Sequence, residues 1–336
     1  MKYLSAVLLF ASSVFTFGNP SRLGVPEELE ATLFSPKELT PCVACLCVAP
    51  TGEVYAGIDQ IGSLGKGAGF GRILRLTDQD NDGVSDGHTV YAEIDNPRGM
   101  ISVGDKLYVL HTKWGDEKKF EGMFLSVLED KDRDGKADGP PKHLVKEIST
   151  RKYNQARGVD HTTNGIRMGI DGWIYVAVGD FGFVDATGTD GTKLTMYGGG
   201  IIRVRPDGTE LETFAHGLRN IYDIAIDPYM NVFTRGNTND GGGWNIRFIH
   251  EVQTGQYGYP TLFKRYTSEI IPALVDVGGG SGTGAMYFDE PGWPKQFTGV
   301  PMMCDWGRGH LFIHRVTPDG PTFTQQQEDF IKCGSC

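Results

Sequence analysis

The sequence is short of positive charge. Its 336 residues include 32 Lys and Arg against 42 Asp and Glu, which gives a formal net charge of −10. Clustered basic residues are what binds nucleic acids and anionic membrane surfaces, so neither is an expected partner. The sequence also lacks a run of about 20 apolar residues, the length that crosses a bilayer, so membrane insertion is not expected either.

A short apolar stretch stands at the N-terminus. Lys2 precedes a mostly apolar segment from Leu4 to Phe17, and the residues GNP follow. This layout is typical of a secretory signal peptide, although the usual A-x-A cleavage pattern is missing and a buried N-terminal strand or helix is the alternative. We predict a signal peptide over residues 1–18 and a periplasmic or secreted protein.

Six cysteines lie in groups at opposite ends of the chain: Cys42, Cys45 and Cys47, then Cys304, Cys333 and Cys336. CVAC and CGSC have the C-x2-C spacing of zinc sites. CVAC, however, lies in an apolar run typical of a strand, where alternate side chains point to opposite faces. Buried thiols or disulfides are therefore favoured over zinc in an exported protein.

Glycine is abundant, at 47 residues without a three-residue period, which indicates many tight turns between short strands. DQDNDGVSDG begins at Asp78 and DKDRDGKADG begins at Asp130, and TGEVYAG and GDKLYVL precede them at almost the same offset. The same order of strand, turn and strand recurs more loosely further along. Four-stranded units that repeat every roughly 45 to 70 residues favour a propeller over a sandwich.

We therefore predict an all-β fold, a β-propeller of the six-bladed type, as a single domain over residues 19–336. Five complete blades are expected over residues 41–94, 97–148, 158–218, 219–263 and 278–330. Residues 29–40 resemble the outer strands and are expected to pair with the last blade and close the ring. Residues 333–336 stand where a missing sixth blade would begin. If the first and last blades are neighbours, a disulfide between the two cysteine groups is a further hypothesis.

The two aspartate runs resemble calcium-binding loops. They place carboxylates at loop positions 1, 3, 5 and 9: Asp78, Asp80, Asp82 and Asp86 in one run, and Asp130, Asp132, Asp134 and Asp138 in the other. Position 12 holds Thr89 or Pro141 in place of the bidentate glutamate, so weaker binding is expected. The alternative is a plain Asx and Gly turn, as in RPDG and TPDG. The extra carboxylates favour a calcium ion with a structural role.

His161 and Asp180 are the candidate catalytic pair. His161 lies in DHTTNG and Asp180 in VAVGDFG, one strand further along. A carboxylate that orients an imidazole leaves its other nitrogen able to take a proton, as in a general base. A satisfied loop or core histidine is the alternative.

Arg219 and Asn220 lie in HGLRNIYDIAIDP, where one blade hands over to the next. An arginine at that rim can hold a carboxylate or a developing oxyanion, or it can form a salt bridge between blades. The Gly-rich loop TRGNTNDGGGWN follows, and its carbonyls could bind a cation or ligand. An ordinary surface loop is the alternative.

These motifs carry a family resemblance. DHTTNGIRMGIDGWIYVAVGDFG, GGGIIRVRPDG, HGLRNIYDIAIDP and GQYGYP, in that order, resemble the soluble glucose and sorbosone dehydrogenases. Those are six-bladed propellers that use pyrroloquinoline quinone (PQQ) and calcium. With NTNDGGGWN, GGGSGTGA and FDEPGWP, the chain from Pro41 onward looks closest to a secreted bacterial branch described as membrane-bound dehydrogenase-like, often fused to a c-type haem domain.

The resemblance implies roles for single residues. His161 would take the proton of a sugar hydroxyl, Asp180 would orient it, and Arg219 with Asn220 would contact the quinone oxygens. The carbonyls of Gly236 and Asn237 would hold the cofactor calcium, with Asn237 standing where the family has proline. The basic residues that grip the cofactor carboxylates in the family have no counterpart identified from the sequence.

The predicted function is that of an exported quinoprotein dehydrogenase that oxidises a sugar or related alcohol. A c-type cytochrome is the implied electron acceptor. The alternative is a non-catalytic, calcium-stabilised propeller that binds carbohydrate or a protein partner, because a fold does not fix a function.

Overall fold

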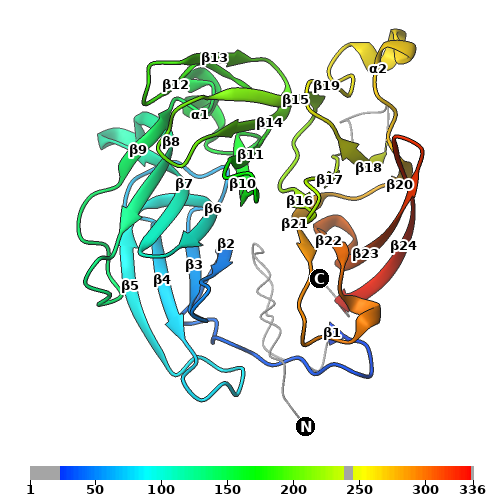
Figure 1. The fold of residues 1–336 in the computed structure, drawn as a ribbon. Helices are drawn as coiled ribbons and strands as arrows, with labels where there is room; N and C mark the ends of the chain where they lie inside the picture. Colours follow the sequence, from blue (N-terminus) through cyan, green and yellow to red (C-terminus); the bar gives the residue numbers. More distant parts are fainter. Residues whose placement is uncertain (1–22, 238–244, 334–336) are drawn as a thin grey trace.

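A computed structural model of the chain describes residues 23–237 and 245–333. Antiparallel units of four strands recur five times along it and surround a common centre, with the first strand of each unit innermost (Figure 1). The chain is thus an all-β propeller with five blades in the part that the structure describes. The six-bladed type and a missing blade after residue 333 stay predictions, and the signal peptide and residues 334–336 lie outside the described residues.

The blades follow the chain in order. The first is β2–β5 (Val43–Val48, Val54–Asp59, Gly71–Thr77, Gly87–Glu93) and the second is β6–β9 (Asp95–Val103, Lys106–Trp114, Phe120–Glu129, Lys142–Lys146). The third is β10, β11, β14 and β15 (Thr163–Met168, Ile174–Val178, Gly199–Val204, Glu212–Leu218). The fourth is β16, β17, β18 and β20 (Ala225–Ile226, Val232–Arg235, Ile246–Glu251, Val275–Gly278), and the fifth is β21–β24 (Gly282–Phe288, Val300–Asp305, His310–Asp319, Thr322–Cys333).

Two insertions extend the blades. The hairpin of β12 (Phe183–Gly188) and β13 (Lys193–Met196) leaves the third blade and adds to the second, where β12 pairs with β9. β19 (Gly255–Gln256) lies parallel to β15 at the edge of the third blade. Short helical turns fill connections: α1 (Arg151–Arg157), α2 (Leu262–Arg265) and 3-10 turns at Asp116–Lys118, Thr267–Glu269, Lys295–Phe297 and Trp306–Arg308.

The fourth blade differs from its predicted bounds of 219–263. Its outer strand is β20, twelve residues and more beyond that limit, at Val275–Gly278. The segment that the sequence placed there instead carries β19 to the third blade and buries Tyr257 completely between the third and fourth blades. The segment around β19 therefore packs Tyr257 into the core between two blades and does not form the outer strand of the fourth blade.

Successive blades share apolar cores because the alternate side chains of each strand face a neighbouring blade. One cluster joins Ile73 and Tyr91 to Leu107 and Val109, across the first and second blades. Equivalent clusters join the second to the third, the third to the fourth and the fourth to the fifth. At the centre, Arg167 of β10 donates to the Asp223 carboxylate and the Ala285 carbonyl, which ties the third blade to the fourth and fifth.

The closing strand is a correction. Residues 29–40 do not pair with the last blade; β1 (Leu23–Gly24) pairs with β24 instead, through Leu23 with Cys333 and Gly24 with Lys332. The carbonyl of Pro36 accepts hydrogen bonds from the amides of Leu39 and Thr40, so a proline turn interrupts any strand in this segment. We name residues 25–42, which run from β1 to β2, the strap. It spans from the last blade to the first (Figure 1).

The strap nevertheless occupies the place of an outer strand against the first blade. Thr32 Oγ1 donates to the Gly83 carbonyl at 2.9 Å, and the Ser85 amide donates to the Phe34 carbonyl at 2.8 Å. Thr89 and Tyr91 of β5 make the same two contacts with the equivalent turn of the second blade. The likeness of residues 29–40 to outer strands therefore reflects a shared position without a shared ladder.

The thiols of the first cysteine group are free. Cys42, Cys45, Cys47 and Cys304 form no disulfide in the structure, and burial raises the pKa of Cys47 to about 12. The proposed disulfide between the two groups is therefore not supported, although Cys336 and the side chain of Cys333 lie outside what the structure describes. Within the described residues, no helix combines the length and apolar character needed to cross a membrane.

Candidate functional site

His161 and Asp180 meet at one end of the third blade. His161 precedes β10 and Asp180 follows β11, and these strands are antiparallel neighbours in which Thr163 pairs with Val178. The start of one strand therefore lies beside the end of the other, and His161 Nδ1 lies 2.5 Å from Asp180 Oδ1. His161 has a left-handed φ of 59°, and its ring stacks on Phe181 with 5.2 Å between centroids.

The second imidazole nitrogen, Nε2, has a different environment from Nδ1. His161 Nε2 lies 4.0 Å from Asp160 Oδ2, beyond hydrogen-bond distance, and that oxygen already accepts from Arg157 Nη2 at 2.8 Å. The His161 side chain retains 15% exposure. One nitrogen is thus held by a carboxylate while the other forms no hydrogen bond among the described residues, as in an oriented general base.

Asp180 is a buried carboxylate with several donors. Its side chain is 8% exposed, its Oδ2 accepts from the Tyr259 hydroxyl at 2.9 Å, and Arg219 Nε lies 3.9 Å from the same atom. Burial works to raise the pKa of Asp180, but the hydrogen bond and charge of His161, the charge of Arg219 and the Tyr259 hydrogen bond together lower it. The carboxylate therefore stays ionised and can stabilise an imidazolium.

The predicted cofactor-binding residues gather beside this pair. Arg219 Nη1 donates to Asn237 Oδ1 at 2.7 Å, and Asn237 Nδ2 donates to the Asn220 carbonyl at 3.2 Å. Asn164, three residues after His161, donates from its Nδ2 to Asn220 Oδ1 at 3.1 Å. Gly236 directly follows β17, and its amide donates to the Arg247 carbonyl at 2.8 Å. We call His161, Asp180, Arg219, Asn220, Asn237 and Tyr259 the rim cluster.

A buried ion pair supports the strand end that carries Gly236 and Asn237. Arg235 Nη2 lies 2.9 Å from Asp305 Oδ2, with side chains that are 2% and 0% exposed. Asp305 Oδ1 accepts from the Ser281 amide at 2.8 Å, and Ser281 forms an isolated bridge with Asn237. The fourth and fifth blades thus position this part of the rim cluster together. The rest of the predicted Gly-rich loop, residues 238–244, lies outside the described residues.

Sequence reasoning did not assign roles to Tyr259, Asn164, Arg235 or Asp305. Tyr259 stood in the quoted motif GQYGYP, and that motif was the available signal. Burial and the Asp180 charge raise the pKa of Tyr259 to about 12, so it remains a hydroxyl donor to that carboxylate. Arg98, on the innermost strand β6, was also missed; its Nε and Nη2 are buried and have no hydrogen-bond partner among the described residues.

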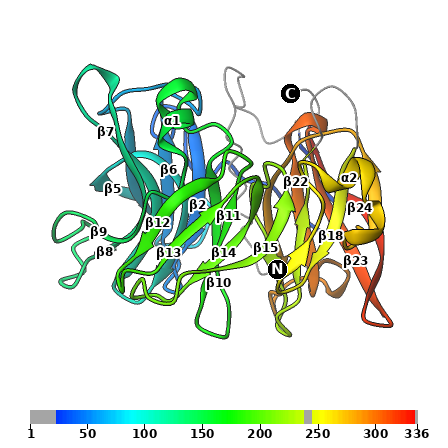
Figure 2. The same ribbon diagram turned by 90° about the horizontal axis from the view of Figure 1, so that it is seen from above.

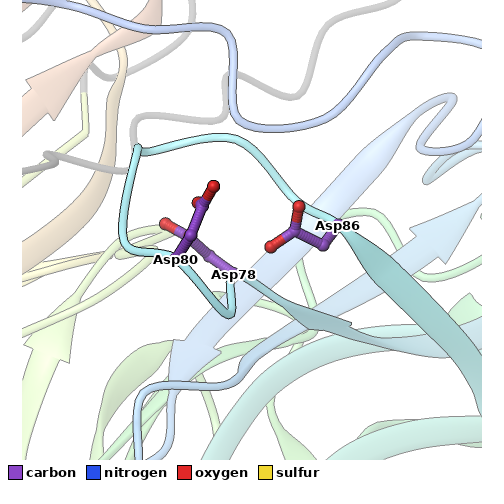
Figure 3. A group of neighbouring side chains, drawn as sticks. All are labelled: Asp78, Asp80 and Asp86. Atoms are coloured by element: carbon purple, nitrogen blue, oxygen red, sulfur yellow. The ribbon is translucent and has the colours of Figure 1, made fainter.

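The two aspartate runs lie at the opposite end of the blades from the rim cluster, in the turns that join β4 to β5 and β8 to β9. Asp78, Asp80 and Asp86 each offer an oxygen within 4.8 Å of the other two, and Figure 3 shows their carboxylates around the turn. Asp130, Asp132 and Asp138 form the equivalent group.

The remaining carboxylate of each run, Asp82 or Asp134, accepts a hydrogen bond from a backbone amide of its turn. Asp82 Oδ1 accepts from the Val84 amide and Asp134 Oδ1 from the Lys136 amide, both at 2.8 Å, as in ordinary Asx turns. The structure thus gathers loop positions 1, 3 and 9 and leaves position 5 outside the group.

Comparison with known proteins adds a family and a fold. The model of a family described as a domain of unknown function (DUF7133) matches residues 48–333. None of the curated proteins matches the chain.

Among solved structures, the PQQ-bound aldose sugar dehydrogenase of Streptomyces coelicolor is similar with a TM-score of 0.61 and 18% identity, over 92% of this chain and 84% of that one. A putative oxidoreductase (glucose dehydrogenase) of Thermus thermophilus gives 0.61 and 15%, over 85% and 83%. The pyranose dehydrogenase PQQ domain of Coprinopsis cinerea gives 0.58 and 8%, over 93% and 87%. At such identities the likeness concerns the fold.

Proposed function

The chain belongs to the DUF7133 family, and we propose that it is a dehydrogenase that oxidises a hydroxyl group of a sugar or related alcohol. The observation that supports this most is the contact between His161 and Asp180, while the other nitrogen of His161 accepts or donates no hydrogen bond among the described residues. The fold shared with sugar dehydrogenases agrees with this proposal. The proposed cofactor is PQQ with calcium.

Two arginines support the proposed binding of an anionic quinone. PQQ carries carboxylates, and a buried cation with unsatisfied donors is a natural partner for such a group. Arg98 offers buried Nε and Nη2 atoms without a hydrogen-bond partner in the described structure, from the innermost strand of the second blade. Arg219, with 6% exposure, adds a second guanidinium at the rim cluster. We propose that Arg219 and Asn220 contact the quinone oxygens and that the Gly236 and Asn237 carbonyls hold the calcium.

His161 carries the proton chemistry in this proposal. Its Nε2 takes the proton of the substrate hydroxyl, while the carbon of that alcohol loses a hydride and becomes a carbonyl. Asp180 holds Nδ1 as the donor and stabilises the imidazolium that forms, and Tyr259 and Arg219 keep the carboxylate ionised and in place. Bound PQQ would supply the hydride acceptor.

The same proposal extends to the setting of the protein. A c-type cytochrome as electron acceptor and a periplasmic or secreted location follow from the resemblance of the motifs. Neither bears on the chemistry of the rim cluster.

The test uses the purified full chain with PQQ, calcium, a dye acceptor and a panel of aldoses. We expect turnover that His161→Ala lowers by about 10²-fold or more, since a general base contributes about 10²–10⁴-fold. His88→Ala is the matched control, because His88 is an exposed histidine of β5 and should leave turnover unchanged. Failure of the wild-type chain to bind PQQ would overturn the proposal and favour a non-catalytic propeller.

A further inference from the structure

The turn between β8 and β9 rests on the neighbouring blade. Its Gly135 carbonyl accepts from Thr89 Oγ1 at 2.7 Å, and its Ala137 amide donates to the Tyr91 carbonyl at 2.9 Å. Both partners belong to β5, the outer strand of the first blade, which lies beside this turn in Figures 1 and 2. The turn therefore adds to the apolar core as a contact between the second blade and the first.

Gly135 shows how closely the turn fits. Its φ is +85°, and a Cβ at this position would meet Thr89 Oγ1 at 2.9 Å and Arg75 Nη1 at 3.1 Å. A change in the conformation of this turn would break both hydrogen bonds to β5, so the contact between the blades depends on the conformation of the acidic loop.

Asp130 is the unusual member of that loop. It is 8% exposed, and its Oδ2 accepts from the Gly135 amide at 3.1 Å. Its Oδ1 is buried and has no hydrogen-bond partner among the described residues. A buried carboxylate oxygen without a donor costs free energy unless a cation or another donor meets it.

Two more carboxylates converge on the same place. Asp132 and Asp138 offer oxygens that lie with an oxygen of Asp130 within 4.8 Å of one another. Asp138 Oδ2 also accepts from the Lys131 amide at 2.9 Å, so the backbone of the turn orients this carboxylate as it orients Asp130. Three carboxylates grouped in this way suit a hard divalent cation, and the flexible oxygen coordination of Ca²⁺ suits a turn better than the strict octahedron of Mg²⁺.

We propose that Asp130, Asp132 and Asp138 bind a calcium ion that fastens the second blade to the first through the seam of Gly135 with Thr89 and Ala137 with Tyr91. The site is independent of the rim cluster and of the proposed dehydrogenase activity. The missing glutamate at loop position 12 predicts weak binding, with a Kd of about 10⁻⁴–10⁻³ M, in the range of extracellular calcium modules.

The experiment uses the full chain in a D80N background, which removes one carboxylate from the equivalent turn at Asp78. Thermal unfolding in EDTA is compared with unfolding at saturating Ca²⁺, and hydrogen exchange is followed in the peptide that holds Gly135 and Ala137. We expect Ca²⁺ to raise the Tm by roughly 2–4 °C and to slow exchange in that peptide.

Two variants and one control decide the outcome. D132N, which changes an exposed residue, should weaken the Ca²⁺ response at least tenfold while it leaves the Tm in EDTA nearly unchanged, and D130N should abolish the response. D207N is the matched control, because Asp207 lies in the single-aspartate turn RPDG of the third blade. A Ca²⁺ response that is absent from the background chain, or equal in D132N, D130N and D207N, would overturn the proposal.

Discussion

Carboxylates are buried in two regions of this molecule with opposite surroundings. At the rim cluster, Asp180 is met by His161, Arg219 and Tyr259, all of which donate to it or carry positive charge, and its pKa is lowered. In the turn of the second blade, burial raises the pKa of Asp130, and the charges of Asp134 and Asp132 raise it further. The rim thus contains its own counter-charge, whereas Asp130 Oδ1 in the turn has no hydrogen-bond partner among the described residues.

The largest expected effect comes from removing the charge at the rim. Asp180→Asn keeps the shape of the side chain but cannot hold His161 Nδ1 as a donor to a carboxylate, nor stabilise an imidazolium. We expect kcat with a sugar substrate to fall by about 10²–10⁴-fold with a smaller change in KM. Asp207→Asn, an exposed aspartate in a turn, is the control for loss of one negative charge. Equal activity of the two variants would contradict the assigned role of Asp180.

Glu251 is a third buried carboxyl group, and its pKa is raised more than that of Asp130. Glu251 of β18 is 2% exposed, and burial raises its pKa to about 8 despite the nearby Arg247 charge and the Tyr257 hydroxyl. The folded chain therefore holds a proton that the unfolded chain releases near pH 4.5, and stability should fall as pH rises from about 4.5 to 8.

Glu251→Gln removes this titration. We expect it to flatten the pH dependence of the free energy of unfolding over that range, with a gain on the order of a few kcal/mol at pH 8. Denaturant unfolding at pH 5 and pH 8 measures it. The same slope in the variant and the wild type would show that Glu251 is ionised in the folded chain.

Tyr259 tests how much one donor contributes to the rim. Tyr259→Phe removes the hydroxyl that donates to Asp180 Oδ2 at 2.9 Å and leaves the ring in place. A hydrogen bond to a charged group contributes about 1.5–3 kcal/mol, so kcat/KM should fall by roughly 10- to 100-fold. The accompanying rise in the pKa of Asp180 should move the acid limb of the pH–rate profile upward. An unchanged profile would separate Tyr259 from the function of the carboxylate.

The smallest expected effects concern the hydrogen bonds that β5 and the strap make with the two aspartate-rich turns. Thr89→Val and Thr32→Val each remove one hydroxyl that donates to a turn carbonyl, at Gly135 and Gly83. Each should destabilise the chain by about 0.5–1.5 kcal/mol, measured by denaturant unfolding. The loss in Thr32→Val should be the smaller one, because no ladder holds the strap beside it. The reverse order would show that the strap is fixed more firmly than β5.

The sequence predicted the parts of the fold that depend on short-range signals. The repeat of 52 residues places the first two blades and Asp-Gly turns place the third, whereas the contact of His161 with Asp180 was a hypothesis that the sequence could not show. The sequence did not predict strand pairings between segments that are far apart in the chain. The β12–β13 hairpin adds to the second blade although it leaves the third, and β20 pairs with β18 after the detour through β19.

The same limit applies to the site. His161, Asp180, Arg219, Asn220 and Asn237 stand in motifs, and the structure brings them into one cluster. The contact between Tyr259 and Asp180 bridges 79 residues, and that between Arg235 and Asp305 bridges 70, without a pattern that distinguishes either pair from other polar residues. Only the assembled ring makes them neighbours.

The strap connects the last blade to the first. Its two anchors differ in kind: a two-residue ladder on the last blade, and single hydrogen bonds with Phe34 in the apolar cluster of the first. The segment between them is coil with a proline turn, so no strand ladder joins the strap to the first blade. The rim cluster draws its residues from the third and fourth blades, across the ring from the strap (Figure 1). The pair His161 and Asp180, for which we propose acid–base chemistry, therefore lies far around the ring from the segment that links the two end blades.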